Sequence, residues 1–191
     1  MRCVAVLGLG SRYSYLAATQ LPALEAEFGI TFDWWPVHSP DLIRRGHGGV
    51  SPFAAPERFG QYDLAYRDKD ARRWAALYGV AYAPPPSGLP ELRSMAETCW
   101  SFTDRSTRRR VAEAVFRAVF ERGEIPDAAF LSRLRTDTGA SDRDGTSAHA
   151  EAVEAALAAG AFGVPTFLID DDLFWGNDRL VLVRDALSAR M

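Results

Sequence analysis

Pro165 constrains the fold of this chain more than any other residue, because it stands where a corner turns into a strand. The corner Gly163–Thr166 leads into the apolar run Phe167–Ile169, and after three aspartates a second apolar run follows, Leu173–Trp175. This pattern predicts a hairpin of two buried strands. Proline cannot donate a ladder hydrogen bond, so Pro165 must lie at the start of its strand. Its peptide bond is either trans, as in about 95% of X-Pro bonds, or cis, which would turn the peptide of Val164 outward for an extended ligand.

The N-terminal residues predict a strand, a helix and a second strand. Cys3–Leu7 is a short apolar run of the kind found in buried strands. A glycine-rich turn follows, and Ser11 is a favourable N-cap for the helical pattern behind it. That helix is expected to end at Gly29, before the second strand, Ile30–Val37. Such an order is typical of a parallel βαβ unit.

The middle of the chain predicts helices and loops. Pro40–Val50 is expected to be a loop centred on its glycines, and Pro56–Tyr78 to be a long helix. Arg110–Glu121 is the clearest helix, because its apolar residues form one stripe. The arginines Arg108–Arg110 could form an anion site, but a solvated helix start is the favoured interpretation.

The order of elements predicts an α/β protein with a thioredoxin-like sheet, in which βαβ and ββα parts are separated by a large all-helical insertion. Residues 1–38 and 160–191 would form the thioredoxin-like domain, and residues 39–159 the helical insertion domain. The last helix is expected to run to Ser188, with Asn177 or Asp178 as its N-cap.

Composition excludes several classes of function. The net charge is −3, so no strong attraction to nucleic acid or to an anionic membrane is implied. The first apolar residues are too few for a signal peptide or a membrane span, which favours a cytoplasmic protein. The two cysteines, Cys3 and Cys99, form no CxxC motif and no cluster with histidine. The sequence therefore offers no cysteine pair for dithiol exchange and no evident ligands for a metal ion.

Ser11 is the candidate catalytic residue. In a thioredoxin-like fold the turn before the first helix carries the reactive group, and here Ser11 and Ser14 stand where redox members have cysteines. A helix N-terminus stabilises an anion by about 0.3–1 kcal/mol, up to ~2 if partly buried. A hydrogen bond to a charged group adds roughly 1.5–3 kcal/mol. Ionising an external thiol at pH 7 requires about 2–3 kcal/mol, so the hydroxyl is needed beside the helix dipole. The alternative is that Ser11 only caps the helix.

Four sequence strings, spread in order over nearly the whole chain, carry a family resemblance. The chain resembles the DsbA-like branch that contains 2-hydroxychromene-2-carboxylate isomerases and kappa-class glutathione transferases, and the last string is more similar to the isomerases. The family usually has proline where Arg12 stands. The four strings are Ser11–Ala17, Asp70–Ala75, Phe162–Phe167 and Phe174–Leu180.

The resemblance implies a glutathione-dependent reaction. Glutathione would lie along the edge at Pro165, its cysteine backbone would pair with Val164, and Ser11 would hold its sulfur as a thiolate. In the isomerases the thiolate adds to a conjugated aromatic substrate, a single bond rotates and the thiol leaves. This implies an isomerase that needs no metal, and the resemblance suggests a homodimer.

Other site residues follow from the same resemblance. Asn177 and Asp178, with Arg179 beside them, would meet the γ-glutamyl end of glutathione, since an ammonium group favours a carboxylate partner. The alternative for these residues is a plain helix cap with Arg179 on the surface. The chain departs from the family where a lysine is expected on the long helix, because Asp63 stands near that position. His47 could replace a missing glutathione donor, or be an exposed loop residue.

Two further functions remain open at this point. One is a thioredoxin-fold protein that binds or reshapes a small molecule, in a biosynthetic step for example, and no longer uses glutathione. The other is a kappa-type glutathione transferase. The departures at Asp63 and in the loop around His47 count against glutathione as the ligand.

Overall fold

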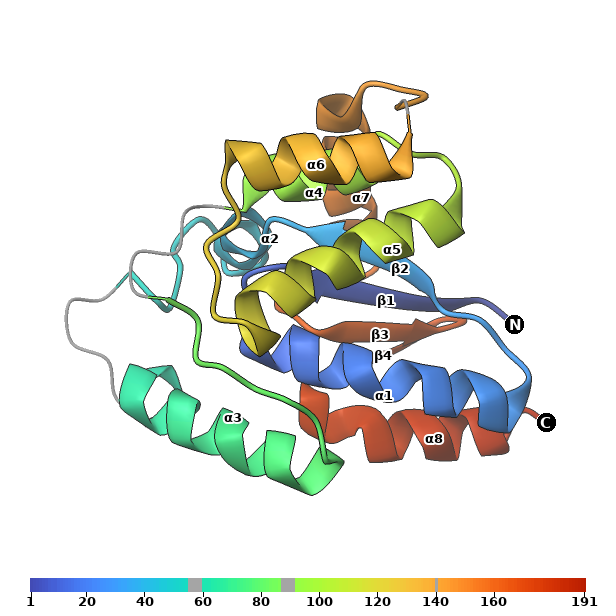
Figure 1. Ribbon diagram of the computed structural model, residues 1–191. Coiled ribbons are helices and arrows are strands. Elements are labelled where there is room, and N and C mark those ends of the chain that lie inside the picture. Colours follow the sequence, from blue (N-terminus) through green and yellow to red (C-terminus); the bar gives the residue numbers. More distant parts are fainter. Residues whose placement is uncertain (55–59, 87–91, 140) are drawn as a thin grey trace.

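The protein is described by a computed structural model over residues 1–54, 60–86, 92–139 and 141–191. Within these residues, four strands form one mixed sheet in the order β2-β1-β3-β4 (Figure 1). β1 runs parallel to β2 and antiparallel to β3, and β4 pairs antiparallel with β3 at the edge. The thioredoxin-like sheet predicted from the order of elements is therefore confirmed. The strands are β1 (Cys3–Gly8), β2 (Asp33–Val37), β3 (Thr166–Ile169) and β4 (Asp172–Trp175).

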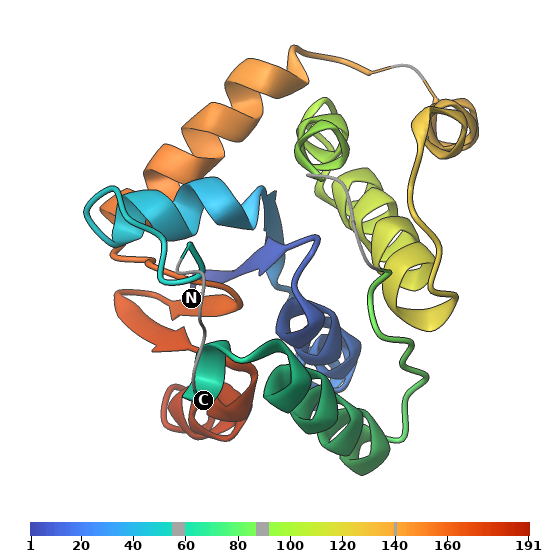
Figure 2. The same ribbon diagram turned by 90° about the vertical axis from the view of Figure 1, so that its left-hand side faces the viewer.

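Helices cover both faces of the sheet. α1 and α8 lie along one face with α3 packed on α1, and α2 and α7 cover the other face (Figures 1 and 2). α4 and α5 pack against β2, and α6 packs on α5. The helices are α1 (Arg12–Phe28), α2 (Ser39–Gly46), α3 (Leu64–Tyr78), α4 (Arg93–Trp100), α5 (Arg105–Phe116), which continues as a π-helical turn (Arg117–Glu121), α6 (Ala128–Thr138), α7 (Gly145–Ala158) and α8 (Leu180–Ser188), with 3₁₀ turns η1 (Gly60–Tyr62) and η3 (Asn177–Arg179).

β1 is the centre of the core and is buried along its whole length. Alternate side chains of a strand point to opposite faces. Ala5 and Leu7 accordingly belong to the cluster with α1 and α8, whereas Val4 and Val6 belong to the cluster with α7. The first cluster also contains residues of α3, α4 and α5. The predicted insertion, residues 39–159, thus shares a core with the sheet, and its division from the rest at residues 38 and 160 stays a prediction.

The predicted loop over Pro40–Val50 is wrong, because most of it is helix α2. Pro40 lies in the first turn, where a missing N–H costs nothing. Asp41 near the start of α2 and the arginines near its end complement the helix dipole.

Asp63 is the N-cap of α3, so the helix predicted from Pro56 begins later, at Leu64. The start of that prediction, residues 56–59, lies outside the described residues.

The C-terminal hairpin and helix also differ from expectation. β3 is buried, but β4 is not, because it is the edge strand: Asp172 and Trp175 are exposed. Asn177 and Asp178 do not cap the last helix. They lie in η3, and α8 begins at Leu180 without a side-chain cap.

None of the helices in the described segments has the length and apolar character that a membrane crossing requires.

The interpretation of Arg108–Arg110 as a solvated helix start is wrong for Arg108 and Arg109. Arg108 is only 4% exposed, and its Nη2 donates to Oδ1 of Asp33 at 2.6 Å. Its Nε donates to the carbonyl oxygen of Trp34 at 3.1 Å. Arg108 therefore joins α5 to β2, and its charge is neutralised at that contact.

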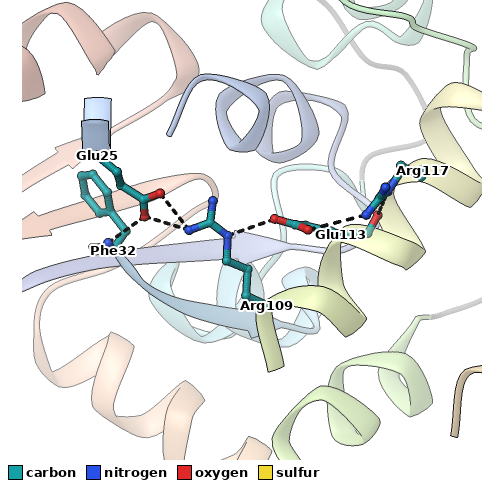
Figure 3. Close-up of polar contacts among 5 residues, drawn as sticks. All are labelled: Glu25, Phe32, Arg109, Glu113 and Arg117. Carbon is teal, nitrogen blue, oxygen red and sulfur yellow. Dashed lines mark hydrogen bonds and ion pairs between the residues drawn. The ribbon is translucent and has the colours of Figure 1, made fainter. Parts of the chain in front are cut away.

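Arg109 makes a second connection, between α5 and α1 (Figure 3). Its Nη1 lies 2.8 Å from both carboxylate oxygens of Glu25, and its Nε donates to Glu113 at 2.9 Å. Glu25 also accepts from the backbone N–H of Phe32 at 2.9 Å. Arg117 also forms an ion pair with Glu113. Ion pairs of partly buried side chains thus attach the helical insertion to the sheet layer.

Arg108→Met should lower the free energy of unfolding by about 3 kcal/mol, because removing one partner of a buried pair leaves the other charge poorly compensated. Arg110→Met is the matched control: Arg110 is exposed, and its loss should change stability by less than about 0.5 kcal/mol. Urea unfolding followed by circular dichroism measures both. Equal stabilities for the two variants would contradict the structural role of Arg108.

Candidate active site

Ser11 occupies the N-cap of α1, as predicted. Its Oγ accepts a hydrogen bond from the backbone N–H of Ser14 at 3.2 Å, and its own N–H donates to the carbonyl oxygen of Gly8 at 2.9 Å. A hydroxyl that accepts through a lone pair still has its proton to donate. Ser11 is 9% exposed, and it is both a helix cap and a hydroxyl with a proton left to donate at the positive end of α1. Ser14, the other serine of the turn, is fully buried and accepts from the N–H of Gly8 at 3.1 Å.

The Val164–Pro165 peptide bond is cis, the second of the two alternatives that the sequence left open. The carbonyl oxygens on either side of Val164 are used: that of Gly163 accepts from Thr166 Oγ1 at 2.8 Å, and that of Pro165 from the N–H of Gly176 at 2.9 Å. In the described parts of the chain, the backbone N–H and C=O of Val164 make no hydrogen bond. They are available to a ligand backbone.

Gly8 brings the corner and the helix start together. A Cβ at this position would lie 2.7 Å from Cγ2 of Val164 and 2.8 Å from Cβ of Ser39. Real Cβ atoms do not approach other atoms so closely, so only glycine permits this contact. Because Gly8 also accepts the hydrogen bond from Ser11, the structure places Ser11 and Val164 on either side of one residue.

Trp175 and the residues after it border the same corner. A Cβ on Gly163 would lie 2.4 Å from Nε1 of Trp175. The N–H of Gly176 donates a hydrogen bond to the carbonyl oxygen of Pro165. The Asn177–Arg179 turn therefore begins directly beside the corner. Asn177 itself is buried and points to α3, where its Oδ1 accepts from Tyr78 at 3.2 Å.

The remaining polar groups of this turn differ in accessibility. Nδ2 of Asn177 is buried and has no hydrogen-bond partner in the described segments. Asp178 and Arg179 are exposed and form an ion pair with each other. Asp178 can thus be reached from solvent next to the corner, whereas Asn177 faces inward.

His47 lies away from Ser11. It follows α2, is exposed, and its Nδ1 is 2.8 Å from the carbonyl oxygen of Ile43. Its ring meets the edge of Phe162 with 6.1 Å between centroids. Both residues line a shallow surface pocket of about 660 Å³ whose lining does not include Ser11 or Val164. The structure therefore does not bring His47 and Ser11 into one pocket.

Contacts between α1 and α3 add residues that the sequence did not single out for the site. Tyr13 donates to Oδ2 of Asp70 at 2.9 Å, and Arg12 Nη1 lies 3.7 Å from Oδ1 of Asp68. Burial and the bond to Asp70 raise the pKa of the Tyr13 phenol, against the opposing charges of Arg67 and Arg12. Asp70 belongs to one of the strings that carry the family resemblance, and this was the only signal for the cluster in the sequence.

Neither cysteine is placed to act as a nucleophile. Cys3 and Cys99 are free and buried, Cys3 in β1 and Cys99 in α4. Burial raises the pKa of both thiols, so both are protonated at neutral pH. No group of His, Cys, Asp and Glu side chains in the described segments is arranged to hold a metal ion.

The fold and the helix start define the class of protein. A family model described as a DSBA-like thioredoxin domain matches residues 9–188, and the chain belongs to this family. Among solved structures of that fold, a probable DsbA oxidoreductase from Streptomyces coelicolor is 17% identical with a TM-score of 0.70, over 99% of this chain and 89% of that one. At that level of identity the likeness concerns the fold alone.

Closer relatives within the family carry one name. A 2-hydroxychromene-2-carboxylate isomerase of Pseudomonas putida is 30% identical over 93% of this chain and 90% of its own length. The protein of the same name from Sphingobium xenophagum is 30% identical over 89% of each chain. The solved structure of a 2-hydroxychromene-2-carboxylate isomerase superposes with a TM-score of 0.82 and 26% identity, over 99% of this chain and 95% of that one.

Gly8→Ala should destabilise the protein by about 1–3 kcal/mol, because the added methyl group overlaps Val164 and Ser39 in a packed region. Adding Val164→Ala to this variant removes one of the two overlaps and should restore part of the loss. The free energies of unfolding of the single and double variants in urea test this. A Gly8→Ala protein as stable as the parent would show that the contact at Gly8 is not restrictive.

Proposed function

We propose that the protein is a glutathione-dependent cis–trans isomerase of the 2-hydroxychromene-2-carboxylate isomerase type, acting on a conjugated aromatic substrate. The observation that supports this most is the hydroxyl of Ser11, which has a proton to donate at the positive end of α1. It lies beside the backbone of Val164, which makes no hydrogen bond to the residues that the structure describes. The names of the relatives supply the type of reaction. The arrangement suits binding of a thiol more than chemistry by the protein's own side chains.

The thiol in this proposal is external. Cys3 and Cys99 are buried in β1 and α4, and burial disfavours their thiolates. A serine hydroxyl cannot exchange with a disulfide, so Ser11 is a ligand of sulfur and not a substitute for it. The site therefore combines a donor for an anion with an open peptide, which are the two features that a cysteine-containing peptide requires.

Glutathione fits these features. The N–H and C=O of Val164 would pair with the backbone of its cysteine residue, and Asp178 offers an exposed carboxylate to its ammonium group. Asn177, Arg179 and His47 remain proposed ligands with a weaker geometric basis, since Asn177 faces inward and His47 lines another pocket. When bound, glutathione would supply a thiolate that adds reversibly to a conjugated double bond and so permits rotation about it.

Ser11 would lower the pKa of the bound thiol. Its hydrogen bond contributes roughly 1.5–3 kcal/mol and the end of α1 about 0.3–1 kcal/mol, against the 2–3 kcal/mol or so needed at pH 7. Ser11 is the larger of the two contributions. Ser14 is not proposed in this role, because its side chain is fully buried beneath the turn.

Ser11→Ala should lower thiol-dependent turnover of 2-hydroxychromene-2-carboxylate by well over tenfold and stability by about 1 kcal/mol, because both the donor and the cap are lost. Ser11→Asp is the matched control: it keeps a capping oxygen, and therefore stability, but places a negative charge where the thiolate would bind. It should be equally inactive. Steady-state kinetics and thermal unfolding separate the two roles, and unchanged kinetics in Ser11→Ala would remove Ser11 from the mechanism.

Glutathione should release or absorb measurable heat on binding, and its thiol should ionise at lower pH in the complex. Calorimetry at millimolar ligand measures the first, and the ultraviolet absorbance of the thiolate during a pH titration measures the second. No heat at that concentration would contradict glutathione dependence and favour a thioredoxin-fold protein that binds another small molecule. Turnover of a generic electrophile, without isomerisation, would instead indicate a transferase.

A further inference from the structure

A second pocket, of about 240 Å³, lies between α1 and the end of α5, and we call it the α1–α5 pocket. Ser11 and Val164 are not among its lining residues, so it is a different site from the candidate active site. Pockets for drug-sized ligands usually measure about 300–1,000 Å³, so this one suits a smaller molecule. Its lining comes mainly from α1, from α5 and from the π-helical turn that follows α5.

Both helices are irregular where they border the α1–α5 pocket. Pro22 lies inside α1 and has no N–H, so the carbonyl oxygen of Ala18 lacks its usual helical donor. On the other side α5 passes into the π-helical turn, where the N–H of Arg122 donates to the carbonyl oxygen of Arg117, five residues earlier, at 3.1 Å. π-helical turns inside helices are frequent at functional sites. The pocket is therefore built by the backbones of the two helices.

Three aromatic side chains line the α1–α5 pocket. The ring of Phe116 lies 6.2 Å from that of Tyr15 and 6.4 Å from that of Trp34, measured between centroids. The opposing residues of α1 include Ala18 and Thr19, whose side chains are small. The apolar part of a ligand would therefore lie against aromatic rings.

Glu121 is a lining residue that has no ion pair among the described residues. Glu113, the other acid of the lining, lies between two arginines, with Nε of Arg109 at 2.9 Å and Nη2 of Arg117 at 3.5 Å (Figure 3). Glu121 is exposed, and the hydrogen bond it accepts from the hydroxyl of Tyr15 is long, at 3.5 Å. Its carboxylate is therefore free to pair with a cation from solution.

The surroundings of Glu121 favour a cation. Arg122, the next residue, is held by Glu124, whose two oxygens accept from its Nε and Nη2 at 2.9 and 3.0 Å. Glu121 is the last residue of the π-helical turn. The partial negative charge at the C-terminal end of a helix adds to the attraction of its carboxylate for positive charge.

We propose that the α1–α5 pocket binds a small aromatic amine in its protonated form. The ammonium group would pair with Glu121, and the ring would lie against Phe116 and Tyr15. This ligand is additional to those of the proposed function, which are a thiol and a conjugated aromatic acid. An acid would meet the carboxylate of Glu121 with like charge, so the pocket discriminates against that class.

Binding of benzylamine and benzyl alcohol at pH 7, followed by ligand-observed NMR, tests the pocket. The two probes have nearly the same size, and only the amine carries a charge. The parent protein should bind benzylamine about fivefold more tightly than the alcohol, and Glu121→Gln should reduce that ratio to about two or less. Equal binding of the two probes by the parent protein, or no binding of either at millimolar concentration, would overturn the proposal.

Two further variants control for charge and for place. Glu151→Gln removes an exposed carboxylate of α7 that does not line the pocket, and it should keep the ratio of the parent protein. Ala18→Leu fills the pocket with a good helix former and should abolish binding of both probes. Thermal unfolding of each variant checks the fold. An unchanged ratio in Glu121→Gln, an equal reduction in Glu151→Gln or undiminished binding in folded Ala18→Leu would each contradict the assignment.

Ser11→Ala separates this pocket from the candidate active site. Because Ser11 does not line the pocket, the variant should bind benzylamine as tightly as the parent protein, whatever its turnover. Loss of benzylamine binding in Ser11→Ala would place the amine at the corner and overturn the inference. Retained binding, with turnover lost, would support both the amine pocket and the role of Ser11.

Discussion

The absence of a side chain at Gly8 is the constraint on which the candidate site depends. Val164 and Ser39 both come within 2.8 Å of the position that a Cβ would occupy, and the same glycine accepts the N–H of Ser11. The start of α1, the start of α2 and the Val164–Pro165 corner are therefore held together at one backbone position. A site that binds a thiol between a hydroxyl and a peptide edge requires such a close approach, because both must reach one small ligand.

Two arginines of α5 connect the helical insertion to the rest of the fold. Arg108 connects α5 to β2, and Arg109 connects it to α1, through carboxylates that are mostly buried. The helical insertion is thereby fixed to the sheet at the edge opposite β4. Within the described residues, the backbone of Val164 has no hydrogen-bond partner, whereas Arg108 and Arg109 are both paired with carboxylates. This contrast is expected of a binding site. Polar groups that will contact a ligand are left without hydrogen bonds inside the protein, and the rest of the structure supplies the stability.

The turn before α1 contains serines and no cysteine. Serines replace the two reactive cysteines of the turn, one as an N-cap with a proton to donate and the other as a buried acceptor. The remaining cysteines are buried elsewhere. Arg12 adds a cation to a helix start that already favours anions.

Local patterns in the sequence were sufficient to predict the βαβ and ββα parts, the cap at Ser11 and the place of Pro165 at the start of β3, because turns, caps and strand periods depend on neighbouring residues. Only the tertiary structure decided the cis form of the Val164–Pro165 bond, the burial of Arg108, and the inward orientation of Asn177 toward Tyr78. It also placed Arg12 beside Asp68 and His47 away from Ser11. Each of these depends on partners far apart in the chain, and a single sequence contains no measure of which distant side chains will meet.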